Sequence, residues 1–272
     1  MSSVLRPDAL AGQVVLVTGG GTGIGRAAAV AAAAAGADVA VCGRRPEPLD
    51  EVAKLVADLG RQCVTHSCDL REPDQVAGMV DRALEHFGRI DVLVNNAGGQ
   101  FMAPAEDLSV NGWRAVHRLA VESVWSVTRE VANRAMIPQR SGLVVFMAFS
   151  PRRGIPGMVH ATAARAAVEN LASGLALEWS RFGIRSLAVA PGTILTEGLR
   201  EQYDEDAIAG WTSAVPLGRL GTPEEVGDLI AFLATPAASY ITGTTVIVDG
   251  GVDAWGTGMP APAPEPREKG QS

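Results

Sequence analysis

The sequence predicts an α/β domain built on one parallel sheet, with helices covering both faces of that sheet. Short apolar runs of strand composition alternate along the chain with longer runs that carry apolar residues at helical spacing. A glycine-rich turn at residues 18–25 separates the first apolar run from a run composed almost entirely of alanine. Strand, glycine-rich turn and helix form the arrangement that brings a dinucleotide's phosphates onto a helix N-terminus.

Taken in order, the apolar runs predict seven strands, at residues 14–17, 38–42, 63–67, 90–94, 144–147, 186–190 and 245–248. The helices between them are expected at residues 26–36, 47–59, 74–87, 111–137, 162–182 and 223–234. Strands and helices that alternate this regularly are joined by right-handed crossovers. The expected fold is therefore a doubly wound, Rossmann-type sheet of seven parallel strands in three layers, α/β/α.

Length and composition favour a single domain. A chain of 272 residues suits one large α/β domain, which we expect to cover residues 1–255. The last stretch, 256–272, is rich in proline, glycine and charge, and is expected to be disordered. A formal net charge of -7 argues against nucleic acid as a partner, and no apolar run is long enough to span a membrane. The cysteines Cys42, Cys63 and Cys68 match neither a disulfide framework nor a metal site, so we expect no metal and a reducing cytoplasm.

The end of the second strand indicates which nucleotide binds. In folds of this kind, the residue at that point contacts the adenosine ribose, and a carboxylate there would repel a 2′-phosphate. This chain has Arg44 and Arg45 instead, and two guanidinium groups suit a phosphate. The alternative is that both are solvated loop arginines. The sequence therefore favours NADP(H) over NAD(H).

From about residue 12 to residue 251, the chain resembles the short-chain dehydrogenase/reductase family. The motifs that carry the resemblance are the glycine-rich turn, Asp69, Asn95-Asn96-Ala97-Gly98, Pro191-Gly192 with Thr196, and Val248-Asp249-Gly250-Gly251. Membership implies a domain that binds a nicotinamide cofactor. The residues that would contact the cofactor by this resemblance are Gly19, Thr22, Gly23, Ile24, Gly25, Asp69, Leu70, Asn95, Ala97, Gly98, Pro191, Gly192, Thr193 and Thr196.

The family's chemistry depends on an asparagine, a serine, a tyrosine and a lysine. Aligned on the flanking motifs, the first three positions hold Ala120, Ala148 and Ala161, and the lysine position holds Arg165. Loss of a positioned proton donor costs roughly 10²- to 10⁴-fold in rate, so ordinary alcohol–ketone chemistry is not expected. Residues 159–166 resemble the branch that includes trans-2-enoyl-CoA and 2,4-dienoyl-CoA reductases. That branch has a tyrosine and a lysine later in the same helix, where this chain has Glu169 and Ser173.

Three residues are candidates to replace the missing groups. His160 has an ordinary pKa near neutrality and could carry a proton, although a histidine at a helix start often only packs or caps. Arg165, one helical turn after Ala161, could bind the nicotinamide ribose or an anionic substrate oxygen, or pair with Glu169. Ser150 lies two residues after the vacant serine position and could take its place.

Three functions are compatible with this sequence. The first is an NADP(H)-dependent reductase of an activated C=C, C=O or C=N bond in a small molecule. The second is a non-redox cyclase, isomerase or dehydratase with a structural nucleotide, and the third is an inactive nucleotide-binding subunit.

Residues 193–220 match the family's substrate lid. The helix at 162–182 packs against its symmetry mate in the family, so a homodimer or homotetramer is expected.

Overall fold

The computed structural model describes residues 5–150 and 154–255, and the predicted tail at 256–272 lies outside them. Seven parallel strands form one sheet in the order β3-β2-β1-β4-β5-β6-β7. Their bounds are β1 Val14–Thr18, β2 Asp38–Gly43, β3 Cys63–Ser67, β4 Val92–Asn95, β5 Gly142–Met147, β6 Ile184–Pro191 and β7 Thr245–Val248. The predicted fold class and strand number are confirmed.

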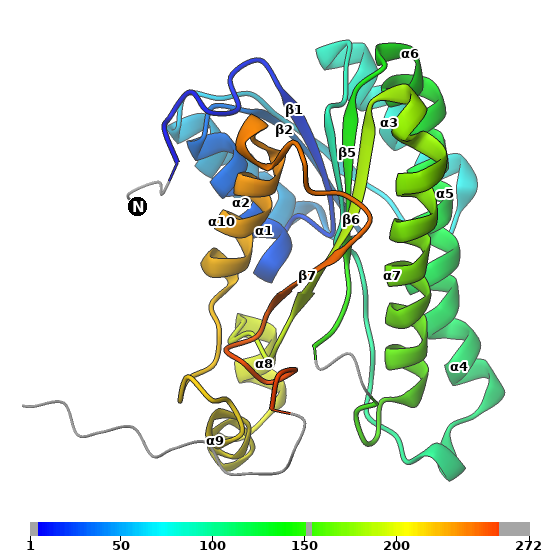
Figure 1. The fold of residues 1–272 in the computed structure, drawn as a ribbon, viewed down its shortest axis with the longest axis vertical. Helices are drawn as coiled ribbons and strands as arrows, with labels where there is room; N and C mark the ends of the chain where they lie inside the picture. The colour runs from blue at the N-terminus through cyan, green and yellow to red at the C-terminus, as the bar shows by residue number, and fades with distance from the viewer. Residues whose placement is uncertain (1–4, 151–153, 256–272) are drawn as a thin grey trace, which may run out of the picture.

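Helices cover both faces of the sheet (Figure 1). One layer contains α1 (Gly23–Ala34), α2 (Pro46–Asp58) and α10 (Pro223–Ala234). The other contains α3 (Pro73–Phe87), α4 (Val110–His117), α5 (Ser123–Val131), α6 (Ile137–Gln139) and α7 (Val159–Trp179). Shorter helical segments are η1 (Ala105–Asp107), η2 (Arg118–Glu122), η3 (Ala132–Met136), η4 (Ser180–Phe182) and η5 (Pro236–Ala238).

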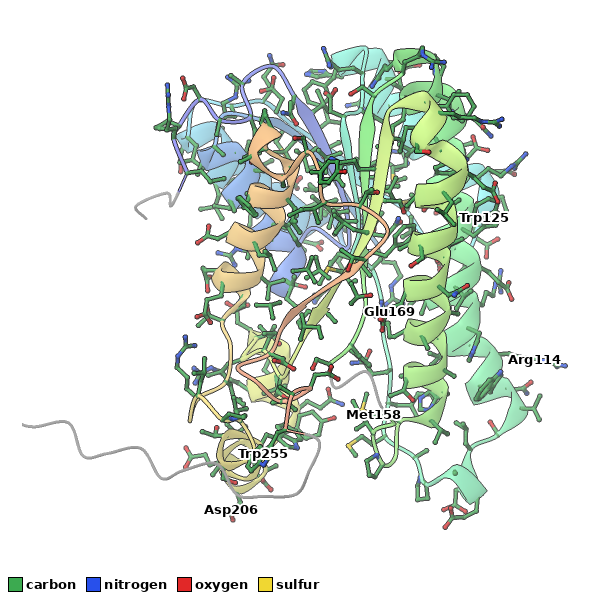
Figure 2. The ribbon with its side chains drawn as sticks, viewed as in Figure 1. Arg114, Trp125, Met158, Glu169, Asp206 and Trp255 are labelled. Atoms are coloured by element: carbon green, nitrogen blue, oxygen red, sulfur yellow. The ribbon has the colours of Figure 1, made fainter. Side chains whose placement is uncertain are left out.

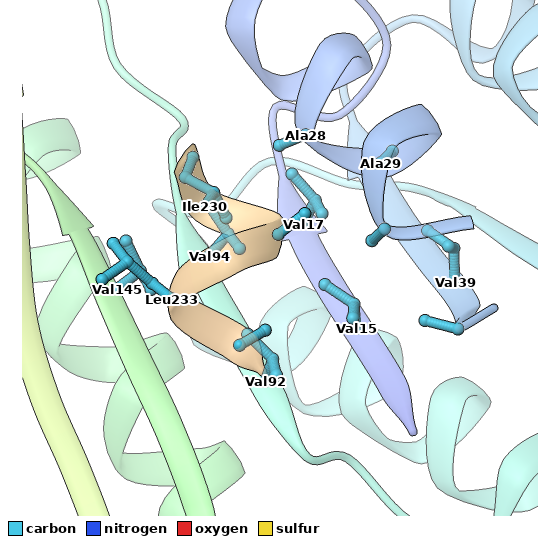
Figure 3. Packing of buried hydrophobic residues seen from close by; sticks show 14 of the residues in the cluster. Val15, Val17, Ala28, Ala29, Val39, Val92, Val94, Val145, Ile230 and Leu233 are labelled. Carbon is cyan, nitrogen blue, oxygen red and sulfur yellow. The ribbon is translucent and has the colours of Figure 1, made fainter. Parts of the chain in front are cut away.

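The small residues of α1 determine how closely the first layer packs. Ala28 and Ala29 are completely buried, and Figure 3 shows them beside the valines of β1, with Ile230 of α10 against the neighbouring strands. A methyl group at Gly227 of α10 would come within 2.7 Å of the backbone of Ala27, so the two helices cross almost in backbone contact. The alanine-rich run is therefore a packing surface for this layer.

The long helix predicted at 111–137 is observed as continuous helical structure from Val110 to Gln139, with two π-helical stretches inside it. The segments η2 and η3 are π-helical turns that interrupt it. The first of them contains Ala120, the residue that the sequence analysis aligned with the family's asparagine. A π turn inside an α-helix commonly occurs at a functional site, because the extra residue shifts the side chains on either side of it.

The expected lid contains two helices that the sequence analysis did not place. These are α8 (Glu197–Gln202) and α9 (Glu205–Ser213), which lie at the carboxyl end of the strands (Figure 1). Thr196 and Asp204 cap them, each accepting a hydrogen bond from a backbone N–H of the first turn. Both helices are too short for hydrophobic periodicity to identify. Whether residues 193–220 act as a lid remains a prediction.

Candidate active site

The glycine-rich turn has the backbone shape that a pyrophosphate requires. Gly19 and Gly23 have left-handed φ angles of 62° and 53°. A side chain at Gly25 would overlap the carbonyl oxygen of Gly19. At the start of α1, Thr22 is extended and its side chain makes no capping hydrogen bond, while the first turn carries no acidic residue. The first backbone N–H groups of α1 have no partner within the helix. Since α1 follows β1 at the switch point of the sheet, between β1 and β4, its start suits a dinucleotide phosphate.

Asn96 holds this turn in place, a role that sequence reasoning missed. Its Nδ2 donates to the carbonyls of Thr18 and Gly19, at 2.9 and 3.0 Å. The backbone N–H groups of Asn96 and Ala97 both donate to the hydroxyl of Thr18, at 3.0 Å. The end of β4 is thereby tied to the glycine-rich turn. The doubled asparagine in the motif was the available signal, but only its first member was assigned.

In folds of this kind, the ligand lies in a crevice outside the carboxyl ends of the strands, and Asp69 follows the end of β3 there. Arg71 forms a bidentate ion pair with Asp69 and, through this contact first of all, lowers the pKa of that carboxyl to about 2. Arg44 adds a weaker electrostatic effect in the same direction. Arg44 and Arg45 are exposed, and the carbonyl of Arg44 accepts a hydrogen bond from Ser67. The carboxylate that was expected to meet the adenine is thus held by Arg71, a third cation that the sequence analysis did not name.

Two of the predicted residues at the strand ends are buried. Leu70 is buried after β3, and Asn95 donates from Nδ2 to Thr128 at 2.9 Å. The buried Oδ1 of Asn95 has no hydrogen-bond partner among the described residues.

The predicted nicotinamide border lies on the opposite side of the crevice. Gly192 donates to the carbonyl of Val248 at the end of β7, and Thr193 accepts from Gly221. A methyl at Gly23 would lie 3.3 Å from the Cγ2 of Thr196, so the start of α8 contacts the glycine-rich turn. Pro191 ends β6 and is buried. The structure therefore brings the Pro191-Gly192 motif and the glycine-rich turn to one crevice.

Alanine occupies three buried positions beside this crevice. Ala120, Ala148 and Ala161 are each 2% exposed. Ala120 and Ala161 belong to one small apolar cluster, together with Val116 and Ala164. These positions present only methyl groups, so none of the three can donate a proton.

Arg165 is a buried cation on α7, one helical turn after Ala161. Its Nη1 donates to the carbonyl of Met147 at 2.7 Å, and its guanidinium lies 5.3 Å from the ring centroid of Phe149. Any side chain at residue 98 would overlap Nη2 of Arg165, so the guanidinium lies directly on Gly98. Burial lowers the pKa of Arg165 to about 10. Glu169, the possible helical partner, accepts a hydrogen bond from Thr245 at 2.8 Å.

Ser150 and His160 differ in their surroundings. The Ser150 hydroxyl donates to Oδ2 of Asp249, a carboxylate that also accepts backbone N–H groups from Gly251 and Asp253. His160 is completely buried at the start of α7, close to Met158, which Figure 2 shows at the carboxyl-end side of the molecule. Neither ring nitrogen of His160 makes a hydrogen bond of normal geometry in the described part of the chain. Burial lowers the pKa of His160, and a contact with the backbone of Phe101 partly opposes this shift.

Two negative findings concern the described residues only. None of their helices combines the length and hydropathy needed to cross a bilayer. Their histidine, cysteine and acidic side chains include no group of three or more that could hold a metal ion.

Comparison with known sequences identifies the family. A family model described as enoyl-(acyl carrier protein) reductase matches residues 19–253. The chain is 40% identical over 243 residues to a probable 2,4-dienoyl-CoA reductase of Bacillus subtilis, covering 88% of this chain and 96% of that protein. It is 36% identical over 255 residues to the peroxisomal 2,4-dienoyl-CoA reductase of Danio rerio, covering 93% and 84%.

Solved structures agree with this assignment. A citronellol catabolism dehydrogenase of Pseudomonas aeruginosa PAO1 is 38% identical, with a TM-score of 0.82 over 93% of this chain and all of that one. A short-chain type dehydrogenase/reductase from Mycobacterium marinum is 34% identical, with a TM-score of 0.84 over 89% and 96%. The chain belongs to the short-chain dehydrogenase/reductase family of oxidoreductases.

Proposed function

We propose that this protein is an NADP(H)-dependent reductase of an activated double bond, with an enoyl-type C=C bond conjugated to a carbonyl or thioester as its best substrate. Activated C=O and C=N bonds are the other acceptors compatible with the site. The names of the relatives, enoyl and 2,4-dienoyl-CoA reductases, support the class of reaction. The observation that carries the proposal is the pairing of a buried Arg165 with alanine at the three other catalytic positions.

Arg165 suits a substrate that becomes negatively charged during the reaction. Burial makes this cation costly, although the carbonyl of Met147 and the ring of Phe149 offset part of the cost. An anion placed against the guanidinium would recover more of it. Addition of hydride to a conjugated alkene produces an enolate, whose charge is delocalised onto oxygen. Arg165 would stabilise that oxygen, and the proton could then be taken from water, because a delocalised enolate requires only a weak acid.

The residues around the crevice support NADP(H) as the cofactor. When bound, NADPH would supply the hydride. The N–H groups of Gly23 and Ile24 would hold its pyrophosphate. Arg44 and Arg45 provide two exposed positive charges near the predicted site of the 2′-phosphate, and Arg71 neutralises the neighbouring carboxylate of Asp69. Leu70, Asn95 and Gly98 would contact the nucleoside parts.

A homodimer or homotetramer is part of the proposal. Leu177 of α7 is 82% exposed, and Trp125 of α5 is 42% exposed on the outer surface of the same layer (Figure 2). Large apolar side chains exposed on adjacent helices are typical of a subunit interface.

Free thiols at Cys42, Cys63 and Cys68 fit a reducing compartment such as the cytoplasm.

The experiment measures NADPH oxidation with three acceptors of matched chain length: an enoyl thioester, a conjugated enone and a saturated ketone. We expect turnover with the first two and none with the ketone. The variant Arg165→Met, which keeps the volume and removes the charge, should lower kcat/KM by about 10²- to 10³-fold, the usual cost of a lost oxyanion donor. Arg181→Met, at an exposed arginine of η4, is the matched control.

Equal turnover of ketone and enone would contradict the proposal. Tight NADPH binding without oxidation by any acceptor would favour the non-redox catalyst or the inactive subunit. The three buried alanines favour these two alternatives, because they cannot transfer a proton.

A further inference from the structure

Two of the three cysteines face each other at the carboxyl ends of neighbouring strands. Cys42 lies near the end of β2, and Cys68 directly follows β3. Parallel pairing places Cys42 opposite His66, two residues before Cys68, so the two thiols point to the same face of the sheet. The N–H of Cys68 also donates to the carbonyl of Gly43 at 2.9 Å. Both cysteines belong to one buried cluster, in which Cys42 is 0% and Cys68 4% exposed.

The two thiols are in contact, and this contact makes them chemically unequal. A hydrogen bond to Cys68 raises the pKa of Cys42, and burial raises it further. The same hydrogen bond lowers the pKa of Cys68, against the effect of burial. Cys42 is therefore the donor, and Cys68 is the sulfur that loses its proton first. Because the thiolate is the nucleophile in thiol chemistry, Cys68 is the reactive member of the pair and Cys42 is placed to react with it in a second step.

The third cysteine lies on the other face of the sheet. Cys63 begins β3, pairs in register with Val39, and packs against the hydrophobic cluster that contains this valine. Burial raises the pKa of Cys63 to about 12. A thiol that stays protonated reacts slowly, so Cys63 serves as an internal control for the pair.

The pair lies between two parts of the proposed nucleotide site. On one side, the carbonyl of Cys42 accepts a hydrogen bond from the N–H of Gly20, in the glycine-rich turn, at 3.1 Å. The sulfur of Cys42 also contacts the backbone of Gly19. On the other side, Cys68 immediately precedes Asp69, the carboxylate that is expected at the adenine. A movement of either cysteine would therefore displace residues expected to hold the nucleotide.

We infer that Cys42 and Cys68 form a redox-active dithiol, which a peroxide converts into a disulfide. The Cys68 thiolate attacks one oxygen of hydrogen peroxide and the O–O bond breaks, which leaves a sulfenic acid on Cys68 and, with a proton from solvent, one water. The Cys42 sulfur then displaces the sulfenic hydroxyl, and its own proton completes the second water. Two thiols thus lose two electrons, and one peroxide is reduced to two waters. A small dithiol reverses the reaction by thiol–disulfide exchange.

Formation of this bond should weaken nucleotide binding, a consequence that rests on the proposed NADP(H) site. Two sulfur atoms joined by a hydrogen bond must approach to about 2.05 Å to form a disulfide. Cys42 is held within β2, whereas Cys68 lies beyond the last paired residue of β3. Cys68 is therefore the residue that moves, and Asp69, next in the chain, moves with it.

The test treats the reduced, nucleotide-free wild-type protein with hydrogen peroxide and maps its peptides by mass spectrometry without reduction. We expect two peptides linked through Cys42 and Cys68, with Cys63 left as a free thiol. The Kd for NADPH, measured by calorimetry, should rise at least about tenfold, the order of one lost charge-assisted contact. Treatment with dithiothreitol should restore the original Kd.

Variants separate the roles of the two thiols. In Cys42→Ala, the second thiol is missing, so peroxide should oxidise Cys68 further to the sulfinic acid, which dithiothreitol does not reverse. In Cys68→Ala, the same treatment should leave Cys42 unoxidised and the Kd for NADPH unchanged. Cys63→Ala is the matched control and should form the same linkage as the wild type.

The wild-type peptide map decides the inference without depending on how any variant folds. Recovery of Cys42 and Cys68 as free thiols, or as separately oxidised residues, would overturn it. A complete linkage that leaves the Kd for NADPH unchanged would overturn the predicted effect on nucleotide binding. If the reduced wild type binds neither NADPH nor NADH, the proposed function fails, and the peptide map still decides whether the dithiol is redox-active.

Discussion

At the scale of single residues, the charge of Arg44 is expected to decide which nucleotide the protein prefers. At the adenosine end, Arg44 is exposed beside the Asp69–Arg71 pair. Such an arginine contributes to nucleotide binding only if a 2′-phosphate is present. We expect Arg44→Ala to raise the Kd for NADPH about tenfold, in line with the loss of one charge-assisted phosphate contact, and to leave the Kd for NADH unchanged. Calorimetry on nucleotide-free protein measures both, and equal losses for the two nucleotides would contradict the 2′-phosphate role.

His160 makes the stability of the protein depend on pH. Its pKa is below the ordinary value of 6.5, chiefly because the ring is buried; the backbone of Phe101 opposes this shift, and His117 on α4 adds a smaller effect in the lowering direction. The unfolded chain therefore binds a proton that the folded chain excludes, and the free energy of unfolding falls as the pH drops below 6.5. Urea unfolding from neutral to mildly acidic pH should show a shallower decline for His160→Phe than for wild type. Parallel declines would mean that the folded ring accepts the proton freely.

At the scale of elements, the glycine-rich turn depends on the end of β4. Asn96→Ala removes both side-chain hydrogen bonds to the carbonyls of Thr18 and Gly19. We expect it to lower the free energy of unfolding by about 1–3 kcal/mol and to weaken NADPH and NADH equally, because the pyrophosphate cradle is common to both. Urea unfolding and calorimetry test this, with Asn111→Ala on the exposed side of α4 as the control. A selective loss of NADPH alone would show that Asn96 acts at the adenosine end.

The sequence predicted the elements wherever local patterning was strong. The five inner strands are largely buried and apolar, whereas the edge strands β3 and β7 are only partly buried. Each strand begins and ends within two residues of its expected bounds. The fourth was expected from residue 90, yet β4 begins at Val92. The carboxylate of Asp91 accepts a hydrogen bond from the N–H of Val14 and forms an ion pair with Arg89. The π turns in the long helix could not be predicted, because they depend on tertiary packing and not on periodicity.

At the scale of the whole molecule, the backbone part of the site was easier to predict than the side-chain part. Glycines with left-handed φ and a strand–turn–helix order are local features, so Gly19 and Gly23 could be assigned from sequence. The role of Asn96 depends on contacts with Thr18 and Gly19, which lie far from it in the chain, so spacing alone does not reveal it. Arg71 pairs with Asp69 only two residues before it, so its role could have been found from the sequence. The assignments of His160, Arg165 and Ser150 as catalytic residues remain proposals.

The central claim is that hydride passes to a conjugated alkene beside Arg165. The most direct measurement uses NADPH deuterated at its transferable position, a long-chain enoyl thioester and ordinary water, with mass spectrometry and NMR of the product. The account predicts a saturated thioester with one deuterium on the carbon β to the carbonyl and a solvent-derived hydrogen on the α carbon. A product that contains no deuterium, or a substrate isomerised or hydrated while NADPH stays intact, would contradict it and favour the non-redox catalyst.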